Sequence, residues 1–167
     1  MSRRARRDLE VVMNTNAKTS ILLAVDTGPR EPGGRQRPAI EMASELAARC
    51  YADQVIVLHV REFAVARLLP MMNEHGGADG QRAVDEIVTS LRAAGVNACG
   101  LVREADAGHV ASAILDAAAE FNARLIVLCA PRRHVLAGSV ATHLLHLAGV
   151  PVVVARQEAL TGAGAGS

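Results

Sequence analysis

The sequence is poor in aromatic residues, lysine and paired cysteines. It has no Trp, one Tyr and two Phe, and Lys18 is its single lysine. Its three cysteines, Cys50, Cys99 and Cys129, form no CxxC pair, so the spacing suggests neither a zinc site nor a redox pair. We therefore expect free, buried thiols in a reducing compartment, and a cytoplasmic protein.

Long apolar runs and an excess of one charge are also missing. No stretch is long enough for a signal peptide or a membrane span, so we expect no membrane partner. The formal net charge of +1 gives no general field to attract nucleic acid, so a nucleic-acid partner is not expected either. The one basic run, MSRRARRD, could contact RNA, DNA or an anionic membrane, but a disordered tail is the preferred interpretation.

Several catalytic and metal-binding patterns are absent as well. The sequence has no GxxxxGK(S/T) loop, no GxGxxG after its first apolar run and no GxSxG elbow, so we predict no catalytic residues. A phosphoacceptor domain would need clustered acidic residues beside Asp26 and a lysine near its last strand. This sequence has neither. His143 and His146 share a helix face and could hold a metal with His134. No carboxylate or cysteine stands beside them, so we predict a polar helix face and no metal site. We interpret His59, inside an apolar run, as a hydrogen-bonded core histidine.

What the sequence does contain is a regular alternation of apolar runs and amphipathic segments. Half of its residues are hydrophobic, mainly Val, Ile, Leu and Ala, which suits buried parallel strands covered by Ala-rich helices. The apolar runs predict strands over residues 21–25, 55–60, 96–104, 125–130 and 150–155. The amphipathic segments predict helices over about 39–52, 81–94, 109–121 and 138–147, with Gly95 ending the second. A short helix could begin in the segment 62–72, and 73–80 is predicted to be a loop.

This alternation predicts one α/β domain with a single doubly wound, five-stranded parallel sheet and helices on both faces. We place the domain at residues 19–156, between a disordered tail at 1–18 and a flexible tail at 157–167. A ligand in such a fold binds beyond the carboxyl ends of the strands, at a topological switch point.

Several ordered segments resemble the universal stress proteins. These are ILLAVDTG, VIVLHV, NARLIVLCA and GSVATHLLHLAGVPVVVAR, and the resemblance covers about residues 19–156. It implies a Rossmann-like fold and a small regulatory or binding protein of the stress response, without catalysis. It also implies a homodimer through the last strand, with Val150, Val152, Val153 and Val154 at the interface.

The resemblance is to the subgroup that lacks the full ATP loop. ATP-binding relatives carry G-x2-G-x9-G-(S/T), but here Cys129 and Arg132 stand where the first two glycines should be. Only nine positions separate Cys129 from Gly138 where the motif has thirteen, and Pro131 removes a backbone N–H from the loop. We therefore expect a degenerate nucleotide site and no certain cofactor, with an ATP- or AMP-type nucleotide as the candidate.

The resemblance and the strand ends together give a set of candidate nucleotide-binding residues. The backbone N–H groups after Ser139 open a helix, which suits a phosphate, and neighbouring arginines could add charged contacts; plain helix capping by Ser139 is the other interpretation. Two alternatives to the hypothesis of a regulatory protein stay open. One is an adenine-nucleotide binding protein with weak or no hydrolysis, and the other is a protein-interaction module that uses loops 28–37 and 130–137. The predicted nucleotide-binding residues are Asp26, Thr27, Val60, Ala130, Arg132, Gly138, Ser139 and Val140.

Overall fold

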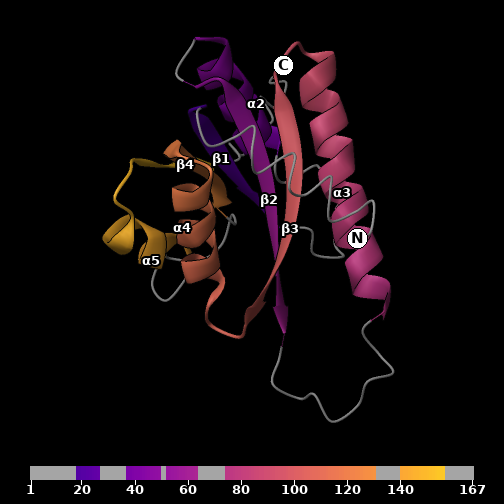
Figure 1. Cartoon of the computed structure of the whole chain (residues 1–167), viewed down its shortest axis with the longest axis vertical. Helices are drawn as coiled ribbons and strands as arrows, with labels where there is room; N and C mark the ends of the chain where they lie inside the picture. Colours follow the sequence, from indigo (N-terminus) through magenta and orange to yellow (C-terminus); the bar gives the residue numbers. More distant parts are fainter. Residues whose placement is uncertain (1–17, 27–36, 50–51, 64–73, 131–139, 157–167) are drawn as a thin grey trace, which may run out of the picture.

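Strands and helices alternate along the chain in the computed structural model (Figure 1). The structure describes residues 18–26, 37–49, 52–63, 74–130 and 140–156. The predicted tails lie outside these residues, except for Lys18. The elements are β1 (Ser20–Val25), α2 (Arg37–Ala48), β2 (Gln54–Phe63), α3 (Glu74–Ala93), β3 (Ala98–Asp106), α4 (Val110–Glu120), β4 (Ala123–Ala130), α5 (Val140–Leu147) and β5 (Val152–Arg156).

The five strands form one parallel sheet in the order β3-β2-β1-β4-β5. The chain builds outward from β1 to β2 and β3, then returns to add β4 and β5 on the other side of β1. The topological switch point therefore lies between β1 and β4. This arrangement confirms the predicted doubly wound α/β fold.

Two apolar cores lie on opposite faces of the sheet because side chains alternate along each strand. On one face Ile21, Val55 and Val57 pack with residues of α2 and α3. On the other face Leu22, Ile56 and Ile126 pack with residues of α4 and α5. Figure 1 shows α3 on one side of the strands and the α4–α5 pair on the other.

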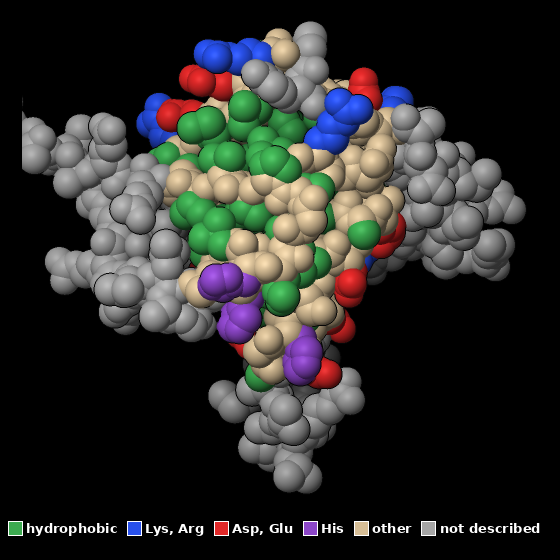
Figure 2. Space-filling view, turned by 90° about the vertical axis from the view of Figure 1, so that its left-hand side faces the viewer, with side chains coloured by type: hydrophobic (Ala, Val, Ile, Leu, Met, Phe, Trp, Pro, Cys, Tyr) green, Lys and Arg blue, Asp and Glu red, His purple; other side chains and the backbone are tan. Residues whose placement is uncertain are grey.

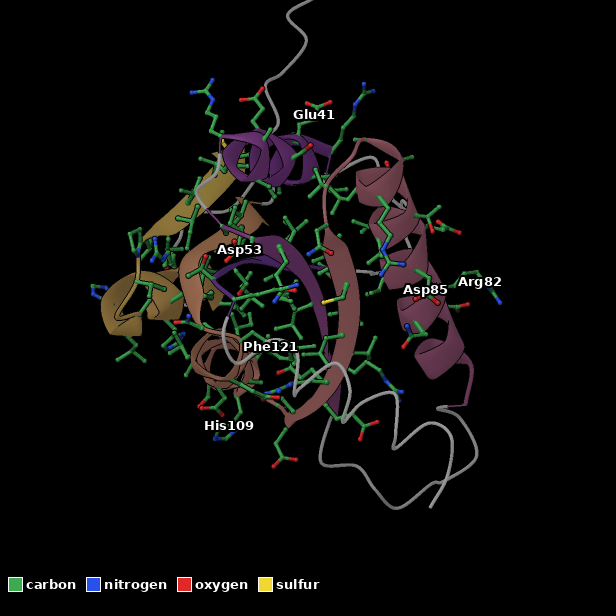
Figure 3. All side chains as sticks on the ribbon, turned by 45° about the horizontal axis from the view of Figure 1, so that its top comes forward. Glu41, Asp53, Arg82, Asp85, His109 and Phe121 are labelled. Atoms are coloured by element: carbon green, nitrogen blue, oxygen red, sulfur yellow. The ribbon has the colours of Figure 1, made fainter. Side chains whose placement is uncertain are left out.

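The outer faces of the helices carry the charges. In Figure 3, Glu41 lies on the outside of α2, and Arg82 and Asp85 lie on the outside of α3. Arg37 pairs with Glu41 one turn along α2, with 2.8 Å between Nε and Oε1. Among the described residues, no helix has the length and apolar character needed to cross a membrane.

The C-terminus of α3 confirms Gly95 as a helix stop. Gly95 has φ +81°, a left-handed conformation that glycine adopts without the penalty of a Cβ. Its N–H donates to the Arg92 carbonyl, and the Val96 N–H donates to the Leu91 carbonyl, each over 3.0 Å. These two bonds are those of a Schellman ending.

Several predicted boundaries were wrong. The helix predicted over about 39–52 ends at Ala48. The segment predicted as a loop over 73–80 is helical from Glu74, because glycine lowers helix propensity by only about 1 kcal/mol per residue and does not forbid the helix. The helix considered from residue 62 onward does not begin there. Glu62 and Phe63 continue β2, because they pair with Ala105 and Asp106 of β3.

The cysteine prediction is tested only at Cys99. Its thiol is free and half-buried, so it is more accessible than expected. Burial raises the pKa of the Cys99 thiol, and the charge of Arg92 opposes this only in part. Cys50 lies outside the described residues.

Candidate functional site

Three predicted site residues lie at one level across three neighbouring strands. Val25 is paired with His59, so Asp26, just after β1, lies level with Val60, three residues before the end of β2. Ala24 is paired with Leu128, which brings Asp26 level with Ala130 as well. Because neighbouring strands lie about 4.8 Å apart, Asp26 lies between Val60 and Ala130 at the switch point.

These residues differ in exposure in a way that suits a mixed apolar and polar ligand. Val60 is half-buried and packs against the core beneath α4 and α5. Asp26 is exposed just beyond the last residue of β1. Val140 opens α5, which covers the Val60 face of the sheet, and it is 37 % exposed. The carboxylate of Asp26, the apolar side chain of Val60 and the start of α5 at Val140 therefore all lie toward the carboxyl edge of the sheet.

Four of the predicted nucleotide-binding residues belong to the segments after β1 and β4. Thr27, Arg132, Gly138 and Ser139 lie outside the described residues. Their proposed contacts with a phosphate therefore stay predictions. Ala130 is placed by its backbone as the last residue of β4.

One side of the site is formed by strands that run beyond β1. Residues Val60–Phe63 of β2 pair with Arg103–Asp106 of β3 after β1 has ended. Figure 1 shows this pair of strands projecting past the rest of the sheet. The Gly108 N–H donates to Glu62 Oε1 over 2.6 Å, which ties the turn before α4 to β2. Sequence reasoning missed this contact because 46 positions separate its partners.

Ionic contacts brace the same strands on both faces. Arg61 and Glu104 lie 3.6 Å apart on the α3 side. On the α4 side, Arg103 pairs with Glu120 and lies over the ring of Phe121, 6.0 Å from its centroid. The carboxyl ends of β2 and β3 are thus held to each other and to α4.

The prediction of a hydrogen-bonded core histidine is confirmed at His59. This side chain is 8 % exposed, and its Nδ1 lies 3.1 Å from the Val25 carbonyl oxygen. A carbonyl oxygen can only accept, so Nδ1 carries the proton. The bond joins β2 to the last residue of β1.

The remaining histidines of interest lie on α5. His143 and His146 are both exposed, as predicted for a polar outer face. Within the described part of the chain, no group of three or more His, Cys, Asp or Glu side chains is arranged to hold a metal ion.

The strand predicted to form the dimer interface is an edge strand. β5 is last in the sheet and pairs with β4. Its residues Val152, Val153 and Val154 are half-buried, and so is Val150 just before the strand.

Comparison with known proteins supports both the fold and the family. The model of the universal stress protein family matches residues 19–156. A universal stress family protein from Burkholderia pseudomallei is 27% identical, with a TM-score of 0.63 over 81% of this chain and 93% of that one. A universal stress protein from Archaeoglobus fulgidus in complex with dAMP is 21% identical, with a TM-score of 0.61 over 82% and 97%. An Arabidopsis thaliana family protein with AMP bound is 17% identical, with a TM-score of 0.58 over 84% and 93%.

A search of curated protein sequences finds no match. The family match nevertheless spans the whole α/β domain, from the residue before β1 to the end of β5. The structure has the sheet, the switch point and the helix placement that the sequence resemblance implied. The chain belongs to the universal stress protein family.

Proposed function

We propose that this chain is a regulatory binding protein that holds an AMP-type nucleotide at the carboxyl edge of the sheet, over β1, β2 and β4, without hydrolysing it. The observation that carries the proposal is the alignment of Asp26, Val60 and Ala130 at the switch point. Ligands of doubly wound sheets bind at this place. Two family structures carry AMP or dAMP, which supports the same ligand class here.

The residues fit the nucleoside part of such a ligand. The half-buried Val60 offers an apolar surface for a flat base. The exposed carboxylate of Asp26 can accept hydrogen bonds from ribose hydroxyl groups, and such charge-assisted bonds are strong. Asp26 directly follows β1, and Val60 lies level with it on the neighbouring strand β2, within the span of one nucleoside.

The loop sequence favours a monophosphate over ATP. The segment from Cys129 to Gly138 is four positions shorter than the family's ATP loop and contains Pro131. Fewer backbone N–H groups are therefore offered to a phosphate chain. Arg132 and Arg133 can replace some of these contacts with a single phosphate, because a guanidinium binds phosphate oxygens in pairs.

Calorimetric titration with AMP, ADP and ATP tests this function. We expect AMP to bind, ATP to bind no more tightly than AMP, and nucleotide to be recovered unhydrolysed. Asp26→Ala should weaken AMP binding by about tenfold or more, since a hydrogen bond to a charged group contributes about 1.5–3 kcal/mol. Asp116→Ala, which removes an exposed carboxylate in the middle of α4, is the matched control and should leave the affinity unchanged. Absence of AMP binding, or ATP binding at least tenfold tighter than AMP, would reject the proposal.

We also propose that the protein is a homodimer in which β5 pairs with its twin. An edge strand presents unpaired backbone groups, and this one carries half-buried valines on both faces. Exposed apolar residues accompany it on α5, where Leu145 is 49 % and Leu147 is 66 % exposed. Figure 2 shows hydrophobic side chains gathered on the side of the molecule where α5 lies, with histidines below them and charged side chains above them and along the right-hand side. A second copy would cover this surface.

A further inference from the structure

His59 occupies a special position relative to the proposed nucleotide site. It lies on the sheet face that packs against α2 and α3, whereas its neighbour Val60 faces α4 and α5. Its Nδ1 donates to the carbonyl of Val25, the last residue of β1, over 3.1 Å. The His59 side chain therefore lies on the face of the sheet opposite to the side chain of Val60.

The two residues that the bond joins precede the two main site residues. Asp26 follows Val25 in the chain, and Val60 follows His59. The pairing of β1 with β2 ends at Val25 and His59, so this side-chain bond acts at the last paired level. It restricts how far the backbone of Asp26 can move relative to the backbone of Val60.

We infer that His59 is a positioning residue, which fixes the spacing of Asp26 and Val60 for the nucleotide through its bond to Val25. The inference rests on the proposed nucleotide site and adds a residue that no direct contact with the ligand would reveal. Displacing a binding group by about 1 Å is enough to reduce its contribution strongly. A donor at Nδ1 is the feature that matters, more than the bulk of the ring.

Two substitutions separate positioning from simple packing. His59→Asn keeps a donor on the atom that corresponds to Nδ1, since the Asn amide nitrogen is also bonded to Cγ. His59→Leu fills the buried site with apolar atoms and removes the donor. Positioning predicts AMP affinity within about twofold of the original protein for His59→Asn and about five- to tenfold weaker for His59→Leu, as one lost hydrogen bond implies.

If His59 only filled space in the core, the two variants would show the opposite order of AMP affinity. Leucine is the more stabilising of the two side chains in a buried apolar site, because burying an amide is costly unless all its groups are bonded. Thermal unfolding of both variants should therefore rank His59→Leu equal to or above His59→Asn. AMP affinity that follows this same order would overturn the inference. Should His59→Leu not fold, His59→Phe removes the same donor and keeps a flat ring like that of imidazole.

A second measurement does not depend on nucleotide binding. Amide hydrogen exchange without ligand should be faster around Val25–Asp26 and Val60 in His59→Leu, and unchanged in His59→Asn. Equal exchange there in both variants would overturn the role of His59 even if AMP binds. Failure of the unmodified protein to bind AMP would instead reject the proposed function, and the exchange comparison would still decide whether His59 fixes the strand ends.

Discussion

Asp53 joins the amino ends of β1 and β2 through a small hydrogen-bond network. Its Oδ2 accepts from both the backbone N–H and the hydroxyl of Thr19, each over 2.9 Å. The Asp53 N–H donates to the Thr19 carbonyl over 2.9 Å, and Asn97 Nδ2 donates to the Asp53 carbonyl over 3.2 Å. Figure 3 labels Asp53 at this end of the sheet. The network therefore lies at the amino end of the sheet, away from the candidate site at the carboxyl edge.

These bonds make a prediction about stability against acid. The backbone bond from Thr19, followed by its hydroxyl, holds the pKa of Asp53 below the ordinary value of 3.8. A carboxylate with a lowered pKa stabilises the fold above 3.8, and this contribution is lost as the pH falls through the folded-state pKa. Asp53→Asn should therefore be less stable than the unmodified protein at pH 5 to 7, and the difference should narrow below pH 3.8. Urea unfolding at a series of pH values measures it.

Thr19→Val is the matched control for this pH dependence. It removes the hydroxyl bond but keeps the backbone N–H, which is the larger cause of the lowered pKa. It should therefore show a smaller stability loss with the same direction of pH dependence. A difference between Asp53→Asn and the unmodified protein that stays constant into strong acid would contradict the role given to this carboxylate.

Single residues show what local sequence can and cannot predict. The apolar surroundings of His59 were sufficient to predict a buried, hydrogen-bonded histidine. Its partner was not predictable, because Val25 is 34 positions away and contributes only a backbone carbonyl, which no sequence pattern marks. The same holds for Glu62 and the N–H of Gly108.

At the scale of elements, β3 and α3 approach each other closely at Gly100. A Cβ built on Gly100 would lie 2.5 Å from Cγ1 and 3.9 Å from Cβ of Val84, and 3.3 Å from Cγ2 of Val88. Val84 is fully buried, and a β-branched side chain has little rotamer freedom on a helix. Gly100, inside the strand predicted over 96–104, is therefore the residue that lets α3 pack closely on β3.

Gly100→Ala should accordingly destabilise the protein by about 1–3 kcal/mol through overpacking, despite the better strand propensity of alanine. Combining it with Val84→Ala should cost at least about 1 kcal/mol less than the sum of the two single changes, because the second change removes the clash. Chemical denaturation of the unmodified protein, the two single variants and the double variant measures the four free energies of unfolding in this double-mutant cycle.

Gly149→Ala is the comparison variant for this experiment. In the described part of the chain, a Cβ at Gly149 would meet no atom within 4 Å, so its stability should change by less than about 0.5 kcal/mol. Equal effects at Gly100 and Gly149 would show that loss of glycine flexibility, and not contact with α3, governs both.

Element boundaries depended on long-range pairing, and for this reason the sequence placed some of them wrongly. Glu62 and Phe63 carry no strand pattern of their own, but they pair with β3 residues 43 positions later, as Phe63 does with Asp106. The apolar runs of β1 and β4 were predicted within one or two residues, because buried strands show their apolar character directly.

For the whole molecule, the alternation of apolar runs and amphipathic segments was enough to predict the parallel sheet and its two covered faces. The candidate site was predictable only where it follows from strand register, at Asp26, Val60 and Ala130. Arg132, Gly138 and Ser139 lie outside the described residues, so strand register does not place them. Binding measurements are therefore the test of that part of the site.

The proposed homodimer is a property of the whole molecule, and the position of β5 at the edge of the sheet makes it directly testable. Light scattering after size exclusion should give twice the chain mass of 17.5 kDa. Val153→Asp should give a folded monomer, because a charge buried beside its twin across paired β5 strands is costly. Val102→Asp is the matched control. It changes another half-buried valine packed on the same core, but on β3 at the opposite edge of the sheet, and should stay a dimer. A monomeric unmodified protein would reject the dimer, and a folded, dimeric Val153→Asp would place the interface away from β5.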